Sequence, residues 1–434
     1  MKTSIKIILT AVFVGFAWVG FAQDNRTFQY DRPVSQDGLN VFETSKTTDV
    51  EYDGFKVRVG GDFALQYQAI SHESDWQYGL IELGKNINLP TANLSIDAQL
   101  AKGVRVHLKT YLSSRHHNEA WVKGGYLQID RLDFIKEDFL SGLMDIVTIR
   151  VGMDDINYGD AHFRRSDNAM ALYNPFVGNY IMDAFTTEPY IEIYFKPGDL
   201  IFMAAISNGY LNPTVQYGAN TDVDNPITFY AKAGWDSQMS DDLRLRLTGS
   251  FYTAPGYNNG NHLYAGDRTG ARYYGVMDYL DASSVASANF RSGRFNPGFA
   301  SETAFQINPF VKFQGLEFFG IFEQTMGTGA EDQEKGSYTQ LGAEALYRFG
   351  SMEQVYFGVR YNSVAGHSYY ATGGTEPEGI NINRINVGGG WFITKNTLLK
   401  VEYVTNSYSG DGFIGSPYEN GKFSGLDIEA VISF

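Results

Sequence analysis

Apolar and polar side chains alternate along most of this chain. In residues 55–67, for example, Val57 and Phe63 fall on one face, while Lys56 and Asp62 fall on the other. Successive side chains of a β-strand point to opposite faces of the sheet. A period of two therefore predicts strands that are apolar on one side and polar on the other.

Sixteen segments share this pattern, and they begin near residues 55, 92, 104, 120, 146, 188, 200, 227, 243, 303, 316, 338, 355, 382, 398 and 423. Short turns such as 196–199 and 314–315 alternate with long polar loops such as 154–187 and 253–302. Transmembrane barrels show this alternation, because short periplasmic turns and longer outer loops join their strands. We therefore predict an all-β fold, a 16-stranded antiparallel transmembrane β-barrel, although about 14–18 strands fit the pattern.

The N-terminus has the features of a secretory signal peptide. Lys2 and Lys6 precede an uncharged apolar run, and the small residue Ala22 ends it before a polar stretch. A basic start, an apolar centre and a small residue at the cleavage site are typical of export signals. We expect three regions: a signal peptide at 1–22, a polar periplasmic N-terminal segment at 23–54, and the barrel at 55–434.

The amino-acid composition excludes several classes of function. The chain has no cysteine, a formal net charge of −15 and 15% aromatic residues. The lack of cysteine excludes a disulfide framework and a thiolate metal site. The acidic balance argues against binding to nucleic acid, which needs a basic surface. The sequence also contains no G-x-S-x-G or H-E-x-x-H motif, so we predict no enzymatic activity, no metal and no cofactor.

The polar face of each strand is expected to line the lumen, because the apolar face of a membrane barrel contacts lipid. These positions carry more Lys and Arg than Asp and Glu, although the whole chain is acidic. They either solvate the lumen and pair across strands or give the channel a weak anion preference. The predicted basic wall residues are Lys56, Arg58, Arg105, Lys109, Arg150, Lys232, Arg244, Arg246, Arg348, Arg360, Arg384 and Lys400.

The long loop at 154–187 combines opposite charges with an apolar middle at 169–177. Opposed charges across a constriction orient dipolar solutes and favour small polar ones. We predict that this loop folds into the lumen and narrows it; the alternative is packing on the outer surface or at a subunit contact. The predicted constriction residues are Asp154, Asp155, Asp160, Arg164, Arg165 and Asp167.

Two features carry a family resemblance. Apolar residues alternate back from the C-terminal Phe434, and this ending resembles the assembly signal of bacterial outer-membrane barrels. The stretch 147–153 followed by the loop 154–187 resembles the trimeric porins, most closely the phosphate-selective porins O and P. The resemblance implies a Gram-negative outer membrane, contact with its lipid and lipopolysaccharide, insertion by the outer-membrane assembly machinery, and a homotrimer.

We predict an outer-membrane porin that forms a passive aqueous channel for small polar or charged solutes, with a weak preference for anions of the phosphate type. Two alternatives stay open. One is a barrel that transports hydrophobic substrates, like the long-chain fatty-acid transporters, which carry an N-terminal hatch inside the barrel. The other is a partner-binding barrel associated with secretion.

Overall fold

The computed structural model describes residues 27–113, 119–211, 213, 227–256, 263–264, 272–279, 292–329, 336–368 and 378–434. The predicted signal peptide, 1–22, lies outside the described residues. Within the described ranges, no helix is long and apolar enough to cross a membrane.

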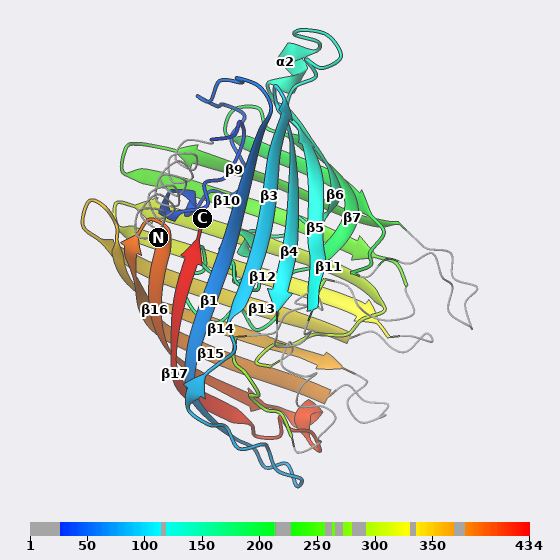
Figure 1. The fold of residues 1–434 in the computed structure, drawn as a ribbon. Helices are drawn as coiled ribbons and strands as arrows, with labels where there is room; N and C mark the ends of the chain where they lie inside the picture. Colours follow the sequence, from blue (N-terminus) through cyan, green and yellow to red (C-terminus); the bar gives the residue numbers. More distant parts are fainter. Residues whose placement is uncertain are drawn as a thin grey trace, which may run out of the picture.

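One antiparallel sheet closes on itself as a barrel (Figure 1). It has 17 strands, of which β2 (Asn86–Ile87) is a two-residue addition to β1. The sixteen long strands are β1 (Lys56–Glu73), β3 (Thr91–Ala101), β4 (Val104–Ser113), β5 (Glu119–Ile129), β6 (Val147–Asp155), β7 (Thr187–Phe195), β8 (Leu200–Ser207), β9 (Thr228–Gln238), β10 (Leu243–Ala254), β11 (Ser301–Phe313), β12 (Leu316–Thr328), β13 (Gly336–Phe349), β14 (Val355–Ser368), β15 (Glu378–Thr394), β16 (Thr397–Ser409) and β17 (Lys422–Ser433).

The predicted 16-stranded antiparallel barrel is confirmed. Each long strand begins within four residues of the position that the alternating pattern indicates. The longest of the turns at the end where β1 starts is 130–146, which contains the short helix α2 (Ser141–Met144). Three further single turns of helix are η1 (Gln36–Gly38), η2 (Ala161–Arg164) and η3 (Asp411–Phe413).

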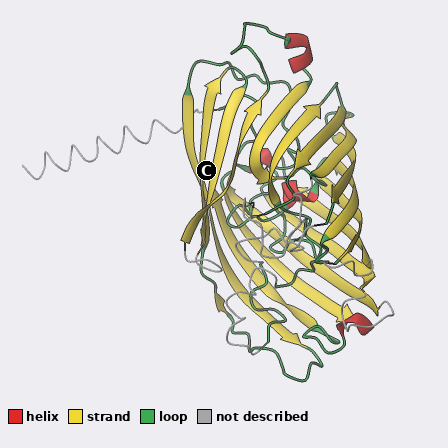
Figure 2. Ribbon diagram, turned by 90° about the vertical axis from the view of Figure 1, so that its right-hand side faces the viewer, coloured by secondary structure: helices red, strands yellow, loops and turns green. Residues whose placement is uncertain are grey.

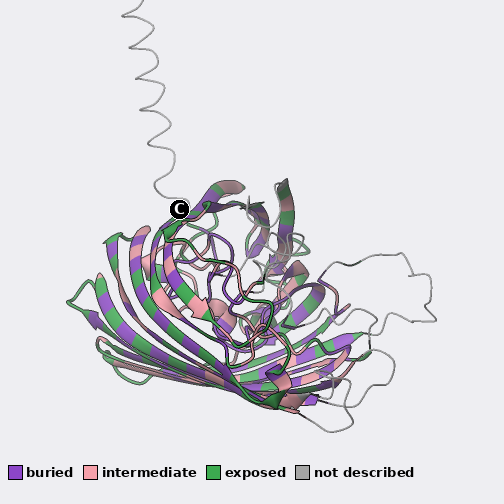
Figure 3. Cartoon of the chain, turned by 90° about the horizontal axis from the view of Figure 1, so that it is seen from below, coloured by how far each residue is buried: buried purple, intermediate pink, exposed green. Residues whose placement is uncertain are grey.

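Exposed and buried side chains alternate along most of the strands, and strictly along β8 (Figure 3). In β8, for instance, Leu200 and Phe202 are exposed while Ile201 and Met203 are buried. The exposed set is apolar, as a lipid-facing surface requires. The inward set is buried because the chain itself fills much of the barrel: irregular segments lie inside the ring of strands (Figure 2).

The barrel closes where β1 meets β17, and the C-terminal residue takes part in that seam. The N–H of Gly61 donates to the Phe434 carbonyl over 2.9 Å, and the Phe434 N–H donates to the Gly61 carbonyl over 3.0 Å. A Cβ on Gly60 would lie 2.5 Å from the same carbonyl oxygen. Glycine is therefore required there for the close approach of the two chain ends. The Phe434 side chain is 56% exposed.

The exposed apolar side chains of the strands lead to a prediction that depends on their depth in the bilayer. Ile307, in the middle of β11, and Phe313, at its end, are similarly exposed, at 46% and 47%. We expect Ile307→Lys to reduce the free energy of unfolding by about 2–4 kcal/mol, and Phe313→Lys by about 0–1 kcal/mol. Urea titration of the protein refolded into lipid vesicles measures both. Equal losses at the two positions would contradict a bilayer centred on the strands.

Candidate functional site

Two segments fill the barrel. The first, here called the inner loop, comprises residues 156–186 between β6 and β7, and most of its side chains are buried. The second, here called the N-terminal segment, comprises residues 27–55 before β1. Both pack against inward-facing side chains of the strands, so the free space of the lumen depends on how they are held.

The cations of β14 and β16 hold the inner loop by its backbone. Arg360 donates to the Gly178 carbonyl over 2.7 Å, and Lys400 donates to the Phe176 carbonyl over 2.9 Å. The N–H of Gly178 in turn donates to the Glu402 carboxylate over 3.3 Å. Charged donors form stronger hydrogen bonds to carbonyls than neutral ones do. These wall residues therefore orient the loop as well as facing the lumen.

The inner loop returns charged side chains to the same wall. Arg164 lies 2.5 Å from Glu317 and 2.5 Å from Glu344, on β12 and β13. Asp160 lies 2.8 Å from Arg246 and 2.9 Å from Lys232, on β10 and β9. All of these side chains are almost completely buried. These two loop charges are therefore neutralised by opposite charges of the wall.

Two more of the predicted constriction residues are enclosed in the same way. Arg165 pairs with Asp183 of the inner loop over 2.6 Å. Asp167 lies 3.2 Å from Lys109 and accepts a hydrogen bond from Tyr111. The sequence pattern identified these residues as the charged members of one loop, but it did not show that their charges are neutralised in buried pairs.

The N-terminal segment differs from the periplasmic extension expected of it. Glu43 lies 2.7 Å from Arg246 and 3.2 Å from Lys232, the two cations that also hold Asp160. Phe42 packs edge-on against Phe310 of β11, with 5.3 Å between the ring centroids. The segment is therefore packed inside the barrel. The polar composition of the segment does not indicate this packing. Its phenylalanines Phe28 and Phe42, which are both buried, are the feature of the sequence that could have indicated it.

Opposite charges control the ionisation of Glu43 and Asp160. Burial disfavours their charged forms, but Arg246 and Lys232 outweigh burial. The pKa of Glu43 is consequently held well below its usual range, and the pKa of Asp160 is also lowered. Both groups are thus carboxylates at neutral pH, and the contacts that they make are charge-assisted.

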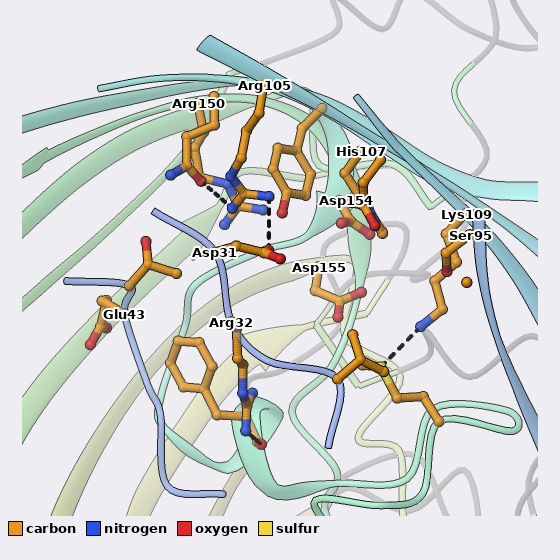
Figure 4. A pocket seen from close by; sticks show the side chains of 18 of the residues that line it. Asp31, Arg32, Glu43, Ser95, Arg105, His107, Lys109, Arg150, Asp154 and Asp155 are labelled. Carbon is orange, nitrogen blue, oxygen red and sulfur yellow. Dashed lines mark hydrogen bonds and ion pairs between the residues drawn. The ribbon is translucent and has the colours of Figure 1, made fainter. Parts of the chain in front are cut away.

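A cavity of about 210 Å³ lies between these two segments and the wall of β1 and β3–β6 (Figure 4). Its lining includes seven Lys and Arg residues and six Asp and Glu residues. Cations and anions thus face each other across a narrow space, an arrangement that suits small polar solutes and water. The charged lining residues are Arg32, Arg58, Arg105, Lys109, Lys123, Arg150 and Lys196, with Asp31, Glu43, Asp62, Asp97, Asp154 and Asp155.

The predicted site residues therefore divide into two groups. Asp154 and Asp155 line the cavity, as do four of the predicted wall cations, Arg58, Arg105, Lys109 and Arg150. The other predicted residues do not line the cavity. The remaining predicted wall cations are Lys56, Lys232, Arg244, Arg246, Arg348, Arg360, Arg384 and Lys400, and the remaining constriction residues are Asp160, Arg164, Arg165 and Asp167.

Sequence reasoning missed Lys123, which lies 2.6 Å from Asp154 and also contacts Asp155. Lys109 of β4 pairs with Gly124 and Thr110 pairs with Val122, so Lys123 is the extra residue of a bulge in β5. An extra residue in one strand breaks the period of two, so the parity rule could not assign the side of Lys123. Among the described residues, no group of three or more His, Asp or Glu side chains is placed to hold a metal ion.

The barrel is similar to solved outer-membrane proteins. OmpT, an outer membrane protein of Vibrio cholerae, matches with a TM-score of 0.51 and 9% identity, over 89% of this chain and 99% of its own. The outer membrane channel DcaP of Acinetobacter baumannii gives 0.50 and 12%, over 88% and 99%. An anion-selective porin from Comamonas acidovorans gives 0.51 and 12%, over 88% and 100%. No family model and no curated protein matches the sequence.

At these identities the likeness concerns the fold. It is a likeness to porin-type barrels in general and does not single out the phosphate-selective porins.

Arg164 provides a stability prediction. Arg164→Gln leaves Glu317 and Glu344 with one cation fewer, although Arg348 remains 3.1 Å from Glu317 and Arg360 remains 2.7 Å from Glu344. Removal of one partner of a buried ion pair costs about 3–5 kcal/mol, and we expect the low end because two cations remain. The matched control is Lys395→Gln, whose exposed pair with Asp37 should contribute about 0–1 kcal/mol. Urea unfolding compares the two variants, and similar losses would contradict a buried role for Arg164.

A second prediction concerns pH. Because the pKa values of Glu43 and Asp160 are lower in the folded than in the unfolded state, the stabilisation is complete above the unfolded values of 4.5 and 3.8 and is lost as the pH falls through the folded values. The contribution of these two carboxylates to the free energy of unfolding should be constant from neutral pH to about 5 and should fall below about 4.5. In Glu43→Gln this fall should be smaller. An unchanged acid profile in that variant would show that Glu43 makes no ionic contribution.

Proposed function

We propose that this protein is an outer-membrane porin, a passive aqueous channel for small polar or charged solutes. The observation that carries the proposal is the cavity with a charged lining inside a closed barrel. The barrel presents an apolar surface to the outside and keeps its charges within, which is the arrangement of a water-filled membrane channel. The fold shared with known outer-membrane channels supports the same function.

The finer proposal is a weak preference for anions, including phosphate-type ions. Lysines and arginines exceed aspartates and glutamates by one along the cavity lining (seven against six). Charged rings select ions through the sign of their net charge, so a small surplus supports a small preference. The proposed constriction consists of Asp154 and Asp155 together with the predicted wall cations that line the same cavity. These cations are Arg58, Arg105, Lys109 and Arg150.

Transport of a hydrophobic substrate is the second candidate, and one observation favours it. The N-terminal segment lies inside the barrel, as the hatch of the fatty-acid transporters does. The cavity lining opposes it, because thirteen of the lining residues are Lys, Arg, Asp or Glu, and moving apolar chains past unshielded charges is unfavourable. We therefore place this candidate, and that of a partner-binding barrel, behind the porin.

The proposal extends to assembly. Insertion by the outer-membrane machinery would use the strand that ends at Phe434, and three copies would form the complete porin. Chemical cross-linking of the protein in outer-membrane vesicles would detect such a trimer.

Planar-bilayer recording tests the channel. We expect the refolded protein to give single-channel steps in potassium chloride and a reversal potential slightly on the anion side in a salt gradient. Asp155→Asn removes a negative charge from the cavity lining, so it should move the reversal potential further toward anions. Asp145→Asn removes the same charge from an exposed position on the 130–146 turn and should leave the reversal potential unchanged.

A folded barrel that carries no current would contradict the proposed channel function. Lipid that co-purifies with the protein and is detected by mass spectrometry would favour the hydrophobic-substrate candidate.

A further inference from the structure

Three arginines face one side of the cavity, on every second strand of this part of the wall, with β3 and β5 between them. Arg58 lies on β1, Arg105 on β4 and Arg150 on β6. The side chains of Arg105 and Arg150 belong to one row across the sheet, because each is paired in register with Gln128 of β5. The Tyr126 ring lies between them, 5.5 Å from Arg105 and 3.8 Å from Arg150. The three arginines and this ring thus form one cationic surface along the wall of the cavity.

The hydrogen-bonding capacity of this surface is incompletely used. An arginine has five N–H donors. Arg150 reaches a carboxylate only at 3.5 Å, from Glu192, and that carboxylate already accepts from Tyr194 and Tyr230. The Nε atoms of Arg105 and Arg150 are buried and have no hydrogen-bond partner within the described part of the chain. Buried donors without partners are rare and costly, so the surface is suited to an additional acceptor.

One carboxylate that faces this surface does not come from the wall. Asp31, in the N-terminal segment, lies 2.8 Å from Arg58 and 3.5 Å from Arg105. It points from the cavity toward the arginines, and a dashed line joins it to Arg105 (Figure 4). Its side chain is 14% exposed. A carboxylate of the chain thus occupies the position that a carboxylate of a solute would take.

The neighbours of Asp31 are anchored independently of it. The N–H of Gln29 donates to the Gln99 side chain over 3.1 Å. Arg32 donates to the Phe163 carbonyl over 3.1 Å and lies 3.7 Å from the centre of the Tyr173 ring. Asp31 can therefore leave the arginines by rotating its side chain, while the backbone of the segment stays in place.

The arginines also keep partners when Asp31 departs. Arg58 retains Asp97 over 2.8 Å, and Arg105 retains Gln128 over 2.8 Å. The cationic surface is thus preorganised, and exchange of one carboxylate for another requires little rearrangement of the wall. Preorganised sites bind with a smaller entropic cost than sites that must be assembled.

We propose that Arg58, Arg105 and Arg150 form a binding site for the carboxylate of a small organic anion, and that Asp31 is a tethered competitor which occupies this site until such a solute displaces it. The inference rests on the proposed channel and adds both its ligand class and a device that limits occupancy. The apparent affinity for a solute then equals its intrinsic affinity multiplied by the fraction of time that Asp31 is displaced. A passing anion is held weakly and released.

Succinate is the probe for the test, and Asp31→Asn is the variant. The substitution keeps the shape of the side chain and removes its charge. If Asp31 holds the site for nine-tenths of the time, the half-blocking concentration of succinate for the chloride current should fall about tenfold in the variant. Asp37→Asn is the matched control, because Asp37 belongs to the same segment but pairs with the exposed Lys395 and does not line the cavity. It should leave the half-blocking concentration unchanged.

Two further measurements complete the design. In the Asp31→Asn background, Arg105→Gln should raise the half-blocking concentration again, and inorganic phosphate should block more weakly than succinate. Calorimetric titration of succinate into the detergent-refolded barrel gives the same comparison without a current, so a failure of the channel proposal is distinguishable from a failure of this one. Unchanged or weaker succinate binding in Asp31→Asn, indifference to Arg105→Gln, or tighter binding of phosphate would each overturn the proposal.

Discussion

The pairing of buried charges is the interaction on which the interior of this protein depends. A barrel wall that carries many inward cations in a confined space is unfavourable unless anions approach them closely. Lys232 and Arg246 illustrate how the need is met. They receive Asp160 from the inner loop and Glu43 from the N-terminal segment. Two pieces of chain that are far apart in sequence are thus brought to the same point.

The same pairing decides where space remains. Over β9–β16, wall cations and carboxylates are matched by backbone and side-chain groups of the inner loop, and the paired side chains are buried. Along β1 and β3–β6 the matching is looser, and a cavity with a charged lining persists. The protein therefore combines a packed half, which resembles the core of a soluble protein held by ion pairs, with a half where arginines retain unused donors.

The strands could be predicted from sequence because the alternation is local: each side chain reveals its side through its immediate neighbours. The same parity placed Arg105 and Arg150 on the inner face. It could not do so for Lys123, where a bulge shifts the register. It also could not reveal the fate of charges in segments without a period. Glu43 meets its partners across 189 and 203 residues, and nothing in the sequence around Glu43 encodes those distances. For the same reason the sequence identified the charges of Arg164 and Arg165 but not their enclosure.

The anchors on either side of Asp31 have a consequence for the time course of transport. Gln29 and Arg32 are both hydrogen-bonded to the interior of the barrel. The backbone between them is therefore held in place, and the part that moves is the side chain of Asp31. Rotations of exposed side chains take picoseconds to nanoseconds, whereas movements of whole loops or domains take microseconds or longer. A passage controlled by one side chain would therefore fluctuate faster than one controlled by the movement of a whole loop. An electrical recording that is slower than this exchange would show a steady current. Its amplitude would average over occupancy of the arginines by Asp31 and by the carboxylates of solutes.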